Sequence, residues 1–251
     1  MDLGLTDRVF IVTGGARGLG RATAEVLVAE GARVVLSGRS ADSLAETRTQ
    51  LGDAAITVVA DNGHADAPDR LVAAADEQWG RLDGALISVG GPPKGPVSST
   101  TDDQWRAAFE GVFLGAVRLA RVIGAALPEG GSLALVLSSS VRQPLTDMAI
   151  SNGLRPGLAM VAKTLADELG PRGVRVNGLL PGRISTERVA ELDASTGDPV
   201  AARAAAEKTI PLGRYGEPAE FGRAAAFVLS AAASFVSGAM LPVDGGMLRA
   251  L

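Results

Sequence analysis

Short apolar runs alternate along this chain with longer segments in which apolar side chains recur every three or four residues. The short runs are typical of strands buried on both faces of a parallel sheet, and the longer segments are typical of amphipathic helices. Strands are predicted at 9–12, 33–37, 55–59, 84–88, 132–138, 174–180 and 239–243. Helices are predicted from Gly20 to Gly31, then at 40–51, up to Trp79, and at 101–127, 148–169, 183–209 (interrupted at 196–199) and 217–229.

This alternation continues through the whole sequence, with no linker, repeat or low-complexity tract. It predicts one α/β domain over residues 1–251, with a doubly wound parallel sheet and helices on both faces. In such a sheet a ligand lies at the carboxyl ends of the strands. The long helix at 101–127 is expected to pack its large side chains into the core, namely Trp105, Phe109, Val112, Phe113 and Val117.

Composition excludes several kinds of site. The 251 residues contain no cysteine and a single histidine, His64, which argues against disulfides, a metal site or a histidine-based triad. The net charge of −4 gives no electrostatic reason to bind nucleic acid. No apolar run is long enough to span a membrane, and no basic-then-apolar leader precedes the first strand. We therefore expect a cytoplasmic protein.

A glycine-rich turn joins the first predicted strand to the first helix. Gly14, Gly18 and Gly20 lie in the order that lets a dinucleotide pyrophosphate approach the backbone closely, at the positive end of a helix. The strand before this turn and the helix after it are the context that such a motif requires. The segment therefore predicts a dinucleotide site.

Several ordered motifs resemble those of the short-chain dehydrogenase/reductase family over nearly the whole chain. The turn matches the family's Thr-Gly-x3-Gly-x-Gly motif, Asp61 matches an aspartate beside the adenine, and 181–186 matches the segment around the nicotinamide carboxamide. The resemblance implies a Rossmann-type seven-stranded sheet, a nicotinamide cofactor, a small carbonyl or alcohol substrate, a lid at about 183–210 and a homo-oligomer, either tetramer or dimer. It assigns cofactor contacts to Gly14, Ala16, Arg17, Gly18, Leu19, Gly20, Asp61, Asn62, Gly90, Pro181, Gly182, Ile184 and Thr186.

Charge near the second strand favours NADP(H) over NAD(H). Enzymes that use NAD commonly end this strand with an acid that grips the ribose hydroxyls. Here Ser37 stands at that position, Arg39 follows it, and Arg17 lies in the glycine turn. Two guanidinium groups are suited to a 2′-phosphate because they form charge-assisted, forked hydrogen bonds.

The catalytic positions depart from the family pattern of Asn, Ser, Tyr and Lys. The serine position falls on Ser138, the tyrosine position on Ser151, the lysine position on Arg155 and the asparagine position on Val112. No shift of the alignment restores the pattern, because the chain's one tyrosine is Tyr215 and no lysine lies four residues after it. The usual proton relay is therefore missing.

The replacements retain part of this chemistry. Ser138 can hydrogen-bond a carbonyl oxygen, and Arg155 can bind ribose hydroxyls and supply positive potential. Ser151 can donate a hydrogen bond but is a poor acid. If the alignment with the family is shifted by one or two residues, Ser139 or Ser140 takes the serine position in place of Ser138. Asp147 is a second candidate for the acid. Ser-x-x-x-Arg resembles a minority branch of the family whose members are often named ketoacyl-carrier-protein-reductase-like.

Three functions remain open at this point. The first is an oxidoreductase with an atypical active site that reduces a carbonyl or oxidises an alcohol. The second is a catalytically inactive NADP(H)-binding protein that acts as a sensor or a partner subunit. The third is an enzyme of another type on the same scaffold, such as a lyase or an isomerase.

Overall fold

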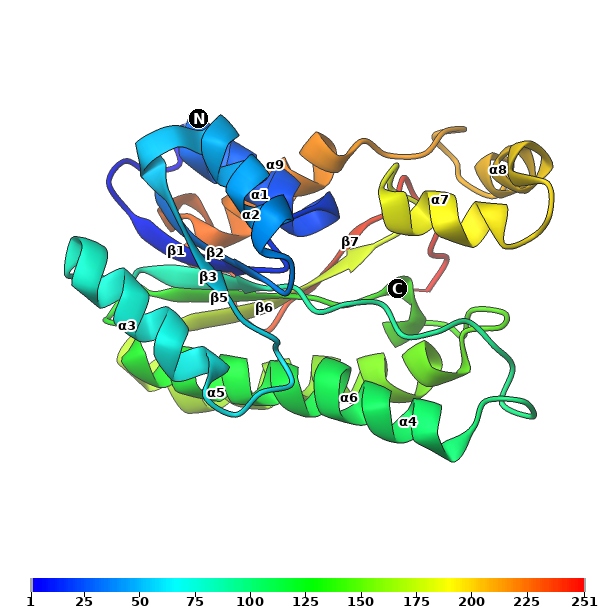
Figure 1. The fold of residues 1–251 in the computed structure, drawn as a ribbon, viewed down its shortest axis with the longest axis horizontal. Coiled ribbons are helices and arrows are strands. Elements are labelled where there is room, and N and C mark those ends of the chain that lie inside the picture. Colours follow the sequence, from blue (N-terminus) through cyan, green and yellow to red (C-terminus); the bar gives the residue numbers. More distant parts are fainter. Residues whose placement is uncertain (1, 251) are drawn as a thin grey trace.

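The computed structural model describes residues 2–250 and confirms a Rossmann-like, doubly wound parallel sheet (Figure 1). Seven strands follow the order β3-β2-β1-β4-β5-β6-β7, and every neighbouring pair is parallel. The strands are β1 (Val9–Thr13), β2 (Arg33–Gly38), β3 (Ala55–Val59), β4 (Gly84–Ile87), β5 (Ser132–Val136), β6 (Arg175–Pro181) and β7 (Met240–Val243). The helices are α1 (Gly18–Ala29), α2 (Ala41–Leu51), α3 (Ala67–Trp79), α4 (Asp102–Ala108), α5 (Gly115–Ala126), α6 (Ala149–Leu169), α7 (Glu187–Ala194), α8 (Pro199–Glu207) and α9 (Pro218–Leu229).

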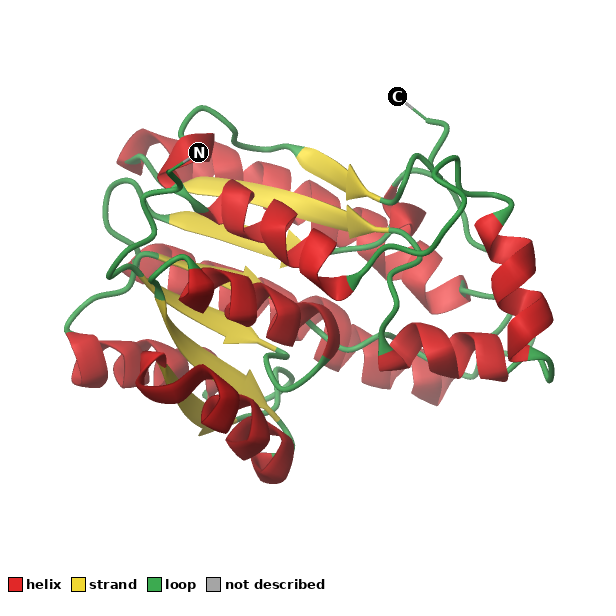
Figure 2. Cartoon of the chain, turned by 90° about the horizontal axis from the view of Figure 1, so that it is seen from above, coloured by secondary structure: helices red, strands yellow, loops and turns green. Residues whose placement is uncertain are grey.

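Each face of the sheet has its own apolar core. One core joins the sheet to α3, α5 and α6 through side chains such as Leu71, Ile123 and Leu158. The other joins it to α1 and α9, where Leu27 and Phe221 are completely buried. Figure 1 shows these helix layers above and below the sheet, and Figure 2 shows the same layers from above. The continuous apolar strands of the sequence are therefore buried on both faces.

The helix expected at 101–127 is present from Asp102 to Ala126, but a π-helical stretch at Phe109–Leu114 divides it into α4 and α5. The helix approaches the loop after β3 at this point. A Cβ on Gly115 would lie only 2.3 Å from the carbonyl oxygen of Asn62. Phe109 is also not a core residue: it is 46% exposed and stacks on Phe113 with ring centroids 5.3 Å apart.

The strand order reverses between β1 and β4, so a crevice opens there at the carboxyl ends. Two reciprocal hydrogen bonds hold its floor together. The hydroxyl of Thr13 donates to the carbonyl of Ser88 at 2.9 Å, and the amide of Ser88 donates back to that hydroxyl at 2.8 Å. The ends of β1 and β4 therefore have a fixed separation beneath any ligand.

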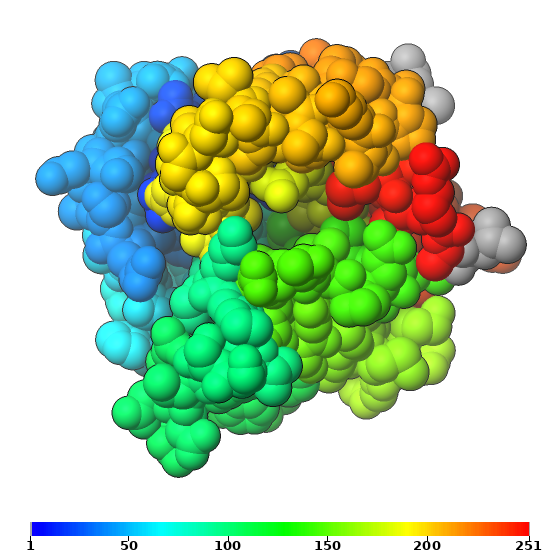
Figure 3. Space-filling view, turned by 90° about the vertical axis from the view of Figure 1, so that its right-hand side faces the viewer, coloured from blue at the N-terminus to red at the C-terminus, as the bar shows by residue number. Residues whose placement is uncertain are grey.

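Helices α7 and α8 lie beyond the carboxyl ends of the strands, within residues 183–210, the segment that the sequence predicts as a lid; we call these residues the lid. The break expected at 196–199 is present, since α7 ends at Ala194 and α8 begins at Pro199. Figure 3 looks onto this end and shows a hollow between the lid, the segments after β4 and β5, and the C-terminal tail. Within residues 2–250, none of the helices is long and apolar enough to cross a membrane.

Candidate active site

The glycine turn has the backbone of an anion cradle. Gly14 and Gly18 adopt positive φ angles of 61° and 55°, which side chains larger than hydrogen rarely adopt. A Cβ on Gly20 would lie 2.2 Å from the carbonyl oxygen of Gly14, so α1 can pack on the turn only with glycine there. The first turn of α1 holds no acidic residue that would occupy its positive end. Backbone and charge both fit a pyrophosphate.

Two exposed arginines flank the outer edge of this cradle. Gly38 and Ala16 are close neighbours, since a Cβ built on Gly38 would lie 3.4 Å from the Cβ of Ala16. Arg39 follows Gly38 and Arg17 follows Ala16, so the two arginines begin at neighbouring points of the backbone. Within residues 2–250, neither arginine side chain has a hydrogen bond or ion pair. Ser37 was expected beside them, but its side chain is fully buried within β2 and its hydroxyl has no partner. Its hydroxyl therefore does not reach a ribose in this structure, and the arginines remain the polar groups at this edge.

Two polar residues follow β3 at the same end of the sheet. Asp61 and Asn62 are half-buried. The side-chain amide of Asn62 donates to the carbonyl of Ser88 at 3.3 Å, and Asp61 accepts the amide of Gly63 at 2.9 Å. Asn62 therefore contacts the crevice floor directly, while Asp61 shapes its own loop.

The segment that follows β6 returns to the glycine turn. Pro181 ends the strand, and a Cβ on Gly182 would lie 2.7 Å from the Cβ of Asp244. Ile184 is buried, and Thr186 caps α7 by accepting the amide of Val189. The methyl group of Thr186 lies 3.8 Å from a Cβ built on Gly18. The structure therefore brings two distant motifs, 14–20 and 181–186, to one side of the crevice.

The serine cluster after β5 resolves the choice of register. β5 ends at Val136, and Ser138 caps a short 3-10 turn by accepting the amide of Ser140 at 3.1 Å. Ser138 is partly exposed, whereas the Ser139 and Ser140 side chains are buried. Within residues 2–250, the hydroxyl proton of Ser138 has no acceptor. Ser138 is therefore the serine of the cluster that can donate a hydrogen bond outward.

Ser151 was expected to face a substrate, and this expectation is wrong for the structure. Its side chain is 3% exposed, and its Oγ lies 3.1 Å from the Oγ of Ser140. The short side chain of Ser151 ends against the 3-10 turn at Ser139–Val141, whereas the longer side chain of a tyrosine would extend past this turn. The two hydroxyls satisfy each other beneath Ser138.

Within residues 2–250, Arg155 is buried without a carboxylate partner. It is 5% exposed, and its guanidinium donates to the carbonyls of Val136 at 2.8 Å and Gly90 at 3.3 Å. Desolvation lowers the pKa of Arg155 to about 10, so it remains a cation near neutral pH. The predicted residues Arg155 and Gly90 are thus in contact, and the charge lies between the ends of β4 and β5.

Asn152 has a structural role that the sequence argument missed. Its amide nitrogen donates to the carbonyl of Leu145 at 2.8 Å, and its amide oxygen accepts the Leu145 amide at 3.0 Å. This paired contact fixes the loop between Ser138 and α6 to the helix. The one available signal was the Ser-Asn pair at 151–152. Asp147, the other candidate acid, is exposed with φ of 54° and lies outside α6.

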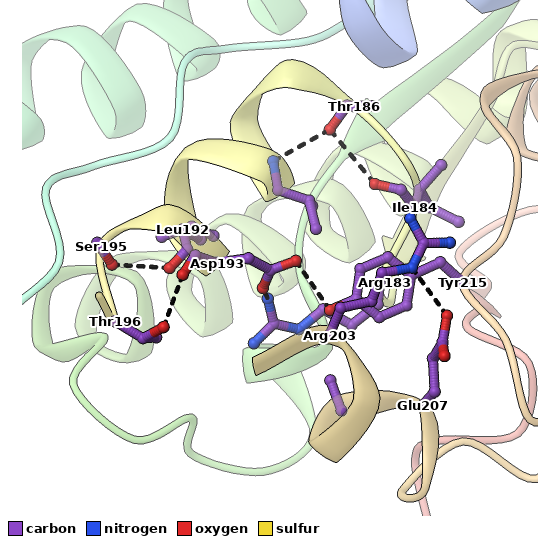
Figure 4. A network of polar contacts seen from close by, with 12 residues as sticks. Arg183, Ile184, Thr186, Leu192, Asp193, Ser195, Thr196, Arg203, Glu207 and Tyr215 are labelled. Carbon is purple, nitrogen blue, oxygen red and sulfur yellow. Dashed lines mark hydrogen bonds and ion pairs between the residues drawn. The ribbon is translucent and has the colours of Figure 1, made fainter. Parts of the chain in front are cut away.

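The lid is tied to the body through one buried carboxylate (Figure 4). Asp193 on α7 accepts the guanidinium of Arg183 at 3.0 Å and the hydroxyl of Tyr215 at 3.0 Å. Asp193 is 7% exposed and Tyr215 is 2% exposed. The guanidinium of Arg203 on α8 lies 4.7 Å from the centre of the Tyr215 ring. The chain's one tyrosine therefore anchors the lid and takes no part in the serine cluster.

Comparisons with known proteins cover almost the whole chain. Residues 14–248 match a family model described as enoyl-(acyl carrier protein) reductase. An uncharacterized oxidoreductase of Mycobacterium tuberculosis is 37% identical over 250 residues, which span 96% of this chain and 91% of that protein. Levodione reductase of Leifsonia aquatica is 33% identical, with coverage of 98% and 96%. The crystal structure of L-sorbose reductase from Gluconobacter frateurii, complexed with NADPH and L-sorbose, covers 100% of both chains with a TM-score of 0.92 and 29% identity.

Proposed function

Because the chain belongs to the short-chain dehydrogenase/reductase family, we propose that it is an NADP(H)-dependent oxidoreductase with an atypical active site. Its substrate would be a small carbonyl compound, or the corresponding alcohol in the reverse direction. The observation that carries this proposal is the cradle at Gly14–Gly20, beside which the side chains of Arg17 and Arg39 have no partner among residues 2–250, at the same end of the sheet as Ser138, which follows β5.

The residues present fit a nicotinamide dinucleotide. The amide groups at the start of α1 would hold the pyrophosphate, and Arg17 with Arg39 would hold a 2′-phosphate. The nucleotide would supply or accept the hydride. The relatives support this choice only in part: the sorbose reductase was solved with NADPH, while L-rhamnose 1-dehydrogenase of Azotobacter vinelandii, 32% identical, is named for NAD(P).

The chain's own groups would act by orientation and charge. The hydroxyl of Ser138 would donate a hydrogen bond to the substrate oxygen, and Arg155 would supply fixed positive potential behind it. No side chain of the serine cluster is an acid near neutral pH, so water would deliver the proton to the oxygen. Loss of a general acid costs about 10²–10⁴ in rate, so turnover is expected to be slow.

Nucleotide titration followed by a turnover screen tests the proposal. NADPH fluorescence should change on binding, and tighter binding of NADPH than of NADH should be lost in Arg39→Ala. A panel of ketones and β-ketoacyl thioesters should then oxidise NADPH. Ser138→Ala should lower turnover with nucleotide affinity unchanged, and Ser98→Ala, an exposed serine, serves as its control. Failure of the protein to bind NADPH or NADH at millimolar concentration would refute the proposal.

A second candidate is a non-catalytic NADP(H)-binding protein. The observation that favours it is the inward placement of Ser151 and Arg155, the two residues that stand where the family has its proton relay. Tight nucleotide binding without turnover across the panel supports this candidate. The double variant Ser151→Tyr with Arg155→Lys would then show whether the pocket still accepts a reductase substrate. The expected homo-oligomer remains a prediction for sedimentation analysis.

A further inference from the structure

A short strap at the start of the lid lies across the proposed nucleotide crevice. We define the strap as Thr186, Glu187 and Arg188, which follow β6 and begin α7. On one side, a Cβ built on Gly18 would lie 3.8 Å from the methyl group of Thr186 and 3.9 Å from a carboxylate oxygen of Glu187. The strap therefore rests on the glycine turn after β1.

On the other side, Arg188 extends to the loop after β4. Its guanidinium donates to the carbonyl of Pro92 at 2.7 Å and forms a looser ion pair with Glu191 at 3.7 Å. A Cβ on Gly91 would lie 2.9 Å from the Nε of Arg188, so the absence of a side chain at 91 makes room for the guanidinium. The guanidinium of Arg188 therefore contacts both Gly91 and Pro92 in this loop.

The two supports of the strap belong to the two strands that border the crevice. β1 leads into the glycine turn, β4 leads into the loop at 91–92, and β1 and β4 are neighbours at the point where the strand order reverses. A ligand in this crevice lies beneath the strap. The distal part of α7 has a separate anchor, because Asp193 is bound to Arg183 and Tyr215. Opening at Arg188 therefore does not require that buried anchor to break.

We infer that Arg188 is a positioning residue that latches the strap over the nucleotide crevice and thereby sets the rate of nucleotide exchange. The inference rests on the proposed nucleotide site. A latch that is made both with and without ligand limits binding and release alike, since each needs the open strap. Weakening it speeds both processes and leaves the equilibrium affinity nearly unchanged.

Stopped-flow fluorescence with NADPH tests the latch in Arg188→Ala. Losing a hydrogen bond from a partly exposed charged group should raise the association and dissociation rates by about fivefold each, with the dissociation constant within about twofold of wild type. Arg188→Lys, which can still donate to the carbonyl of Pro92, should recover part of the slow exchange. Lys94→Ala is the control, because it removes an exposed cation from the same loop.

Hydrogen exchange of the ligand-free protein gives a readout that does not need nucleotide. Amides of residues 186–190 should exchange faster in Arg188→Ala, while those at Asp193 and Ala194 should not change. If wild type binds no nucleotide, the proposed function fails, and this exchange measurement still tests the strap contact. If wild type binds but both rates in Arg188→Ala stay within twofold, the inference is wrong. A change confined to dissociation, with weaker affinity, would identify a direct nucleotide contact and overturn the latch.

Discussion

Replacing Arg155 by methionine removes a positive charge from the interior while keeping an apolar side chain of similar length. Burial lowers the pKa of Arg155 well below its ordinary value, to about 10. At about 1.4 kcal/mol for each pH unit, the folded protein disfavours the charged form by about 3 kcal/mol relative to water. Arg155 therefore lowers the free energy of unfolding. Such a cost is expected of a buried charge that serves a function.

The substitution also removes two hydrogen bonds, to the carbonyls of Val136 and Gly90. Leaving these acceptors without a donor costs about 1–2 kcal/mol in total, because the Gly90 contact is long and only part-buried. Arg155→Met should therefore stabilise the fold by about 1–2 kcal/mol and raise the melting temperature by about 2–6 °C. Turnover should fall by about 100-fold as the positive potential is lost.

Thermal unfolding by circular dichroism, with a turnover assay on the same sample, measures both effects. Arg175→Met is the matched control. Arg175 is also a buried arginine with a lowered pKa, but it donates to four carbonyls, those of Val228, Leu229, Ser230 and Val236. That variant should melt at least about 4 °C lower, because four acceptors lose their donor. If Arg155→Met lowers the melting temperature as much as Arg175→Met does, Arg155 is a structural residue and the reasoning fails.

The remaining predictions concern Tyr215, Ser37 and the titration of Arg155. Tyr215→Phe removes the donor to buried Asp193 and should speed hydrogen exchange of α7 amides about tenfold, since a hydrogen bond to a charged group contributes about 1.5–3 kcal/mol; unchanged exchange would contradict the anchor. Ser37→Ala deletes a buried hydroxyl without a partner, so chemical denaturation should show equal or higher stability and titration should show unchanged NADPH affinity; weaker binding would return Ser37 to the cofactor site. Turnover should be flat from about pH 6 to 9 and fall above pH 10, where Arg155 loses its proton. Above pH 10 the folded protein releases the proton of Arg155 while the unfolded chain still binds it, so the free energy of unfolding of wild type rises with pH. The difference in stability between wild type and Arg155→Met should therefore shrink above pH 10.

The sequence determined the parts of this protein that depend on local periodicity and on residue identity. Apolar runs and helical spacing predicted the alternating elements, and the glycines at 14, 18 and 20 predicted a tight turn, in which positive φ angles or close backbone contacts disfavour side chains. Counting tyrosines and lysines predicted that the usual proton relay is missing. The strands and the glycine turn are confirmed, because each is specified within a few neighbouring residues.

Tertiary structure decided which polar groups face the crevice. Arg155 meets carbonyls 19 and 65 residues away, and the strap meets a loop 96 residues before it. Ser37 was expected to face the cofactor and Ser151 the substrate, but packing from distant segments buried both side chains. The π-helical stretch likewise ends where Gly115 closely approaches Asn62, a residue far from it in sequence. A pattern of residue types cannot specify such contacts, because burial and hydrogen bonding depend on segments that only the fold brings together.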